Sequence, residues 1–92
     1  MLDSVAVVIG RATTPGFRDP RYRELIARLS AKRREMGVTQ EQLASRLGLH
    51  KQFVSRVELG ERRLDVVELI DFARALQIDP TDLLISVSER EN

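Results

Sequence analysis

The sequence predicts an all-α fold of five short helices around one core. Apolar residues recur every three or four positions from Tyr22 to Ile85, which is the spacing of helices with one buried face. Gly37, Gly48 and Gly60 divide this stretch at intervals that suit helix ends. With 92 residues and no cysteine, the chain is long enough for a single modest core and has no disulfide framework.

Residues that commonly cap helices mark the limits of the first two helices. Asp19-Pro20 suits a cap followed by a first helical position, so the first helix is expected at about 20–36. Thr39 and Gln42 have the spacing of a capping box, which starts the second helix. Gly48 is expected to end that helix.

Three more helices follow at short intervals. The third is expected from Lys51 to Leu59, with His50 as a weak cap. Asp65 with Glu68 opens the fourth helix as a second capping box. Asp79-Pro80 begins the fifth helix.

The apolar residues on these helices predict the core. Gln77 stands where glycine would be favoured, so a left-handed backbone there is expected to cost about 1 kcal/mol. The residues expected to face inward are Tyr22, Leu25, Ile26, Leu29, Met36, Leu43, Ala44, Leu47, Leu49, Val54, Val57, Val67, Leu69, Ile70, Phe72, Ala73 and Leu76.

The two ends of the chain differ from its middle. Residues 1–19 are interpreted as an N-terminal arm, with a short extended segment at Val5–Ile9 followed by a turn or linker. Residues 20–87 form the predicted domain, and 88–92 a polar tail.

Composition excludes several classes of function. His50, the only histidine, cannot build a metal site alone, and neither a catalytic acid–base cluster nor a cofactor motif is present, so no enzyme, metal or cofactor is expected. No apolar run approaches the roughly 20 residues of a membrane span, which favours a cytoplasmic protein. Residues 1–64 carry 13 basic and 7 acidic side chains, whereas residues 65–92 carry 2 and 7. A basic half facing a polyanion is the polarity of a nucleic-acid binder.

The stretch TQEQLASRLGLHKQFVSRVE, residues 39–58, has the pattern of a helix-turn-helix. A small residue, Ala44, falls where the second helix of the pair crosses, and Gly48 suits the turn. The combined signature is Thr39-Gln40, Leu43-Ala44, Leu47-Gly48, Val54-Ser55 and Glu58-x-Gly60-x-Arg62. It resembles the phage-repressor or Cro-type helix-turn-helix family, also called Xre-like, over about Tyr22 to Leu84. The resemblance implies a compact five-helix repressor-like domain that binds double-stranded DNA and regulates transcription as a homodimer, with repression as the expected mode.

The resemblance also implies residue roles. Lys51, Gln52 and Arg56 match base-reading positions, because Arg pairs well with guanine and Gln with adenine. The positions that match DNA backbone contacts are Gln40, His50, Ser55, Arg62 and Arg63. The alternative for Lys51, Gln52 and Arg56 is a solvated face, for Gln40 an exposed residue at a helix start, and for Arg62 and Arg63 loop charge. His50 is either a cap or a phosphate neighbour, and Gln40 can also brace the second helix of the motif.

Three further residues have structural interpretations. Arg33 and Glu58 match positions that form a buried ion pair in similar domains, which would make both structural. Phe53 either packs at the rim of the core or lies against a thymine methyl group or sugar.

Dimerisation has two candidate surfaces, a C-terminal one with Leu84, Ile85 and Val87 and an N-terminal one with Val5, Val7 and Ile9. The rival function is an antitoxin or restriction–modification controller, in which DNA binding is combined with a protein partner.

Overall fold

Five α-helices account for most of residues 18–89, which are the residues that the computed structural model describes. They are α2 (Pro20–Glu35), α3 (Gln40–Leu47), α4 (Lys51–Leu59), α5 (Val66–Ala75) and α6 (Pro80–Ser88). No strand occurs among residues 18–89, so the all-α prediction is confirmed there. The extended segment predicted in the arm, with Val5, Val7 and Ile9, lies outside the described residues.

The predicted capping boxes are both present. The Thr39 hydroxyl accepts the Gln42 N–H at 3.0 Å, and the Gln42 side chain accepts the Thr39 N–H at 2.9 Å. Asp65 and Glu68 make the same reciprocal pair at 2.7 and 2.9 Å. The His50 side chain makes no capping hydrogen bond, so α4 begins without one. Local hydrogen bonds therefore set where α3 and α5 begin.

Left-handed residues end several of the helices. Gly48 has a φ of 69° and closes α3, as its missing Cβ allows. Gln77 follows α5 with a φ of 61° and is the one non-glycine residue with positive φ between 18 and 89. The strain expected at Gln77 is present, at a cost of about 1 kcal/mol.

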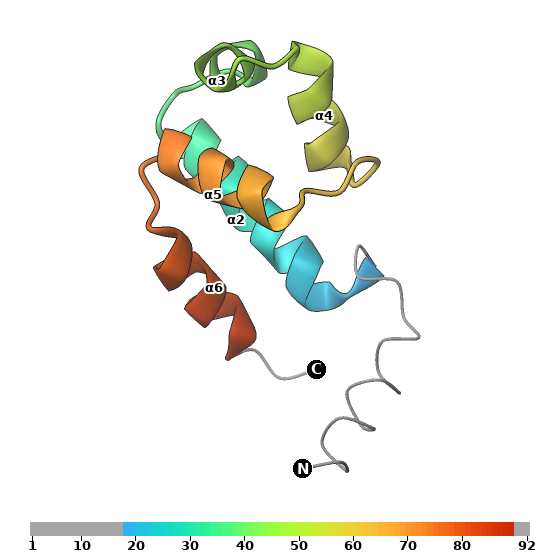
Figure 1. Cartoon of the computed structure of the whole chain (residues 1–92), viewed down its shortest axis with the longest axis vertical. Coiled ribbons are helices and arrows are strands. Elements are labelled where there is room, and N and C mark those ends of the chain that lie inside the picture. Colours follow the sequence, from blue (N-terminus) through green and yellow to red (C-terminus); the bar gives the residue numbers. More distant parts are fainter. Residues whose placement is uncertain (1–17, 90–92) are drawn as a thin grey trace.

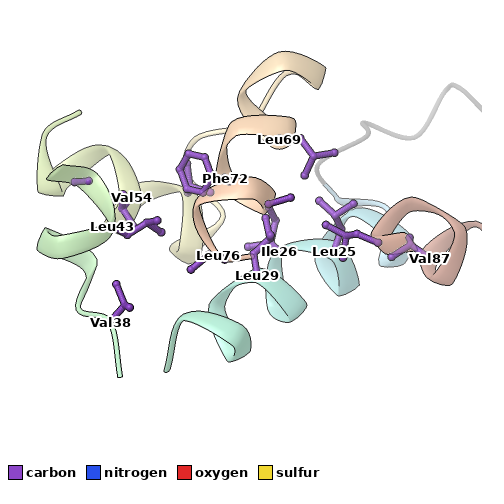
Figure 2. Packing of buried hydrophobic residues seen from close by; sticks show 14 residues of the cluster. Leu25, Ile26, Leu29, Val38, Leu43, Val54, Leu69, Phe72, Leu76 and Val87 are labelled. Carbon is purple, nitrogen blue, oxygen red and sulfur yellow. The ribbon is translucent and has the colours of Figure 1, made fainter. Parts of the chain in front are cut away.

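One apolar core connects the helices. Figure 1 shows α3 and α4 at one end of the molecule and α6 at the opposite side, with α2 and α5 between them. In Figure 2, Phe72 and Leu76 of α5 lie between the helix-turn-helix residues Leu43 and Val54 on one side and Val87 of α6 on the other. Helix α5 therefore joins the packing of the α3–α4 pair to that of the rest of the domain.

Two residues expected in the core are exposed. Val67 is 66% exposed, because it lies two residues before buried Leu69 and points to the opposite side of α5. Leu49 is 37% exposed, since it sits in the turn between α3 and α4 and reaches only the rim of the core. Both predictions were wrong because an apolar residue near a helix end does not itself reveal which side it faces.

None of the helices within residues 18–89 is both long enough and apolar enough to span a membrane.

Burial should decide the cost of shortening a valine in this domain. Val54 is 0% exposed, so Val54→Ala removes buried methyl groups and should lower the free energy of unfolding by about 1.5–3 kcal/mol. Val67→Ala removes the same atoms from an exposed site and should change it by less than about 0.5 kcal/mol. Urea unfolding followed by circular dichroism measures both values, and equal losses would contradict this description of the core.

Candidate nucleic-acid interface

Helices α3 and α4 are joined by the three residues Gly48, Leu49 and His50. The Leu49 N–H donates to the Ala44 carbonyl at 2.8 Å, which turns the chain back over the end of α3. The Ala44 side chain is buried and is only a methyl group, so it lets α4 approach closely. Figure 1 shows α4 running in a clearly different direction from α3, as in a helix-turn-helix.

The outer face of α4 carries polar side chains that have no partner in the described part of the chain. Lys51, Gln52 and Arg56 are exposed, and Ser55 is half-buried. Their side chains make no hydrogen bond or ion pair with any residue from 18 to 89, and the same holds for exposed His50. Donors on Lys51, Gln52 and Arg56 are thus open to an external ligand on the side away from the core.

A buried ion pair holds the C-terminal end of α4 against α2. The Arg33 guanidinium donates to both carboxylate oxygens of Glu58, at 2.7 and 2.9 Å, and also to the Val38 carbonyl at 2.9 Å. The two charged side chains are only 10% and 12% exposed. The Gln40 amide donates to Glu58 at 2.9 Å, so α3 joins the same carboxylate. The Gln40 amide thus braces α4, one of the two roles considered for it.

The charged form of Glu58 is favoured despite its burial. Burial alone raises the pKa of Glu58, but hydrogen bonds from Arg33 and Gln40, together with the Arg33 charge, bring the pKa below its ordinary value of 4.5. The buried Ser30 hydroxyl lies beside this carboxylate and favours the charged form further, although no atom meets full hydrogen-bond geometry with it. The network therefore holds a carboxylate anion.

The loop after α4 holds Arg62 in a fixed position. Its guanidinium carbon lies 4.5 Å from the centre of the Phe53 ring, and a terminal nitrogen donates to Glu68 at 3.0 Å. The other terminal nitrogen donates to the carbonyl of exposed Arg63. The Phe53 ring lies 6.2 Å from the Phe72 ring and packs against the core, which places Phe53 at its rim.

Sequence reasoning missed two contacts of the loop between α4 and α5. Glu68 was assigned only to its capping box, yet its second oxygen binds Arg62. Tyr22 was assigned only to the apolar face of α2, but its hydroxyl accepts the Leu64 N–H at 3.1 Å and so anchors the loop between α4 and α5. The polar end of a tyrosine is a usable signal for such an anchor, because a buried hydroxyl commonly finds a partner.

No group of three or more histidine or acidic side chains within residues 18–89 is arranged to bind a metal ion.

Comparisons with known proteins agree with this geometry. The family model described as helix-turn-helix matches residues 29–83. An uncharacterized HTH-type transcriptional regulator of Sinorhizobium fredii, y4dJ, is 37% identical over 57 residues, which cover 62% of this chain and 74% of the relative. The solved structure of an XRE-family like protein from Pseudomonas syringae pv. tomato is 46% identical, with a TM-score of 0.71, over 74% of this chain and 83% of that chain.

Glu58→Gln should destabilise the domain strongly at neutral pH. The substitution leaves the buried Arg33 cation without its anion, so the free energy of unfolding should fall by about 3–5 kcal/mol. Because the folded-state pKa of Glu58 lies below 4.5, its stabilising contribution is complete above pH 4.5 and is lost as pH falls through the folded-state pKa. Urea titrations of both proteins from pH 7 to pH 3 should therefore show their difference shrinking in acid.

Glu61→Gln is the matched control. Glu61 is exposed and makes no hydrogen bond or ion pair with its side chain within residues 18–89, so this equal change of charge should leave stability nearly unchanged. A Glu58→Gln deficit that stayed constant down to pH 3 would argue against a charged Glu58 as the stabilising group.

Proposed function

The chain belongs to the Xre-type helix-turn-helix family of DNA-binding transcriptional regulators, which are not enzymes, and on this premise we propose that it binds a specific operator as a small dimeric repressor. The observation that carries the proposal is the exposed outer face of α4, where Lys51, Gln52 and Arg56 have no partner within residues 18–89. A domain seated in the major groove over a promoter excludes polymerase, which is the basis for proposing repression.

Base reading is assigned to the side chains on the outer face of α4. Arg56 presents a planar fork that matches the two acceptors of guanine, and Gln52 presents the donor and acceptor that match adenine. Lys51 lies at the first position of α4, where it reaches a guanine or a neighbouring phosphate. Their exposure and their lack of internal partners support this role, because no internal contact has to break when DNA binds.

Phosphate binding is assigned to the residues around α4. Arg62 keeps donors open after binding Glu68 and Arg63, since a guanidinium has five N–H groups. Phe53 stacks beneath the Arg62 guanidinium and orients it, so the Phe53 ring is covered. This supports a packing role for Phe53 rather than contact with a thymine. The other proposed backbone contacts are Gln40, His50, Ser55 and Arg63. The Gln40 side chain is held by Glu58, so it approaches a phosphate in a fixed orientation.

Dimerisation gives such a small domain enough base contacts for specific binding. A single module buries little surface on DNA, and a two-fold dimer doubles the contacts. Leu84 and Ile85 of α6 are 45% and 48% exposed, which supports α6 as a contact surface. Val87, also expected on this surface, is only 7% exposed and packs in the core, so that expectation was wrong. The alternative surface at Val5–Ile9 lies outside the described residues.

Selection of bound duplexes from a random pool tests the function. The selected sites should contain two half-sites related by two-fold symmetry, with centres about one helical turn, roughly 34 Å, apart. Footprinting of the selected duplex should protect both half-sites at the same protein concentration. A single unrepeated half-site would count against the dimer, and recovery of no preferred sequence would count against specific binding.

Arg56 and Arg62 should differ in their effects on DNA binding. Arg56→Ala should cost about 1–3 kcal/mol of preference at one base pair of each half-site, because it removes a base contact. Arg62→Ala should weaken all sequences alike and lower the salt dependence by about one ion per protomer, since it removes a phosphate contact. Fluorescence anisotropy with the selected site and single-base variants measures both effects. Two variants that merely bind every duplex less tightly would contradict this division of roles.

A further inference from the structure

A groove of about 500 Å³ runs along α2 beside the C-terminal end of α4. Its walls come from Arg18, from α2 and from Glu58, Leu59 and Gly60 at the end of α4. Arg62, a proposed phosphate contact, follows Gly60 by two residues. The groove thus ends, along the sequence, two residues before a proposed phosphate contact.

Four residues of α2 form a straight strip along this groove. Arg23, Ala27, Ser30 and Arg34 are spaced by four, three and four residues and line the groove together. Eleven residues make three helical turns, so the two arginines point to the same side, about 16 Å apart along the helix axis. Ala27 and Ser30, which lie between the two arginines in the strip, are small, and Tyr22 and Ile26 also line the groove.

The two arginines in the strip differ from their neighbours on α2 in their charge environment. Arg21 pairs with Asp19, Arg28 with Glu24 and Arg33 with Glu58. Arg23 and Arg34 are exposed and make no ion pair with any residue between 18 and 89. The groove therefore carries positive charge that the described part of the chain does not neutralise.

The remaining lining also fits an anionic strand with an apolar side. Glu58 is the one acidic residue that lines the groove, and its charge is already bound by Arg33. Leu59, on the wall from α4, is 69% exposed and presents an apolar surface to the groove. A sugar–phosphate backbone combines phosphate oxygens with apolar sugar faces, and arginine forks bind phosphates with two parallel hydrogen bonds.

We infer that this groove receives one sugar–phosphate strand of the DNA next to the bases read by α4, with Arg23 and Arg34 as phosphate-binding residues. The inference rests on the proposed function. One strand carries a phosphate for each 3.4 Å of duplex axis, so a 16 Å strip faces several of them. The contact surface thereby extends from the helix-turn-helix onto α2, and it adds affinity without base preference.

The double variant Arg23→Gln/Arg34→Gln tests this directly. Each lost phosphate contact lowers the slope of log affinity against log salt by about 0.9. The slope for the double variant should therefore be lower by close to two per protomer. The effect should be the same on the selected site and on a 30-bp random-sequence duplex, while preference among base variants stays unchanged. Phosphate-ethylation interference should lose signals on one strand of each half-site.

Arg28→Gln is the matched control. It removes the same charge from the same helix, but Arg28 is paired with Glu24 and lines a different pocket with Lys32 and Glu35. Its salt slope should stay within about 0.3 of the unchanged protein, well below one contact. Circular dichroism should show all variants folded, since the three replaced side chains are exposed.

The outcomes separate this inference from the proposed function. If the unchanged protein selects a site and the double variant keeps the full salt slope, the groove does not bind DNA, and a protein partner becomes the occupant to seek. An equal loss of slope in Arg28→Gln would reduce the effect to net charge and would also overturn the inference. If the unchanged protein binds no duplex, the proposed function itself fails.

Discussion

The ion pair between Arg33 and Glu58 is the contact on which the arrangement of α3 and α4 depends. It joins the last turn of α2 to the last turn of α4, and Gln40 brings α3 to the same carboxylate. Apolar packing alone is non-directional and tolerates small shifts of one helix over another. A forked guanidinium on a carboxylate fixes both distance and orientation, so the pair sets the angle at which α4 presents its outer face. Burial makes this arrangement sensitive to the loss of either partner.

Local features of the sequence were enough to predict most of the fold. The two capping boxes, the left-handed glycines and strained Gln77 depend on neighbours within a few residues, and each has its expected conformation. The exposure of Val67 and Leu49 depends on how elements pack together, and there the expectation failed. Periodicity gives one face of a helix, but the side chains at its ends lie where that face meets solvent.

In the candidate site too, some features could be predicted from the sequence and others could not. The residues on the outer face of α4 were identified because the motif fixes which positions point away from the core. The contacts of Arg62 with Phe53 and Glu68 join residues from three elements, and no spacing rule in the sequence brings them together. The groove along α2 was also not anticipated. Its strip is visible in the spacing of Arg23 and Arg34, but their lack of partners emerges only when the other arginines are placed.

The contacts that shape the interface also join residues far apart in the sequence, and this has a consequence for folding kinetics. Tyr22 and Leu64 are 42 residues apart, and Arg33 and Glu58 are 25 apart, whereas the helices form from neighbours. Local contacts form early in small helical domains, and closing long loops costs chain entropy first. We expect the loop between α4 and α5 to order after the rate-limiting step, so its contacts govern how slowly this part of the domain opens and hardly affect how fast the chain folds. In such a domain, the rate of local opening and the rate of folding are set by different residues.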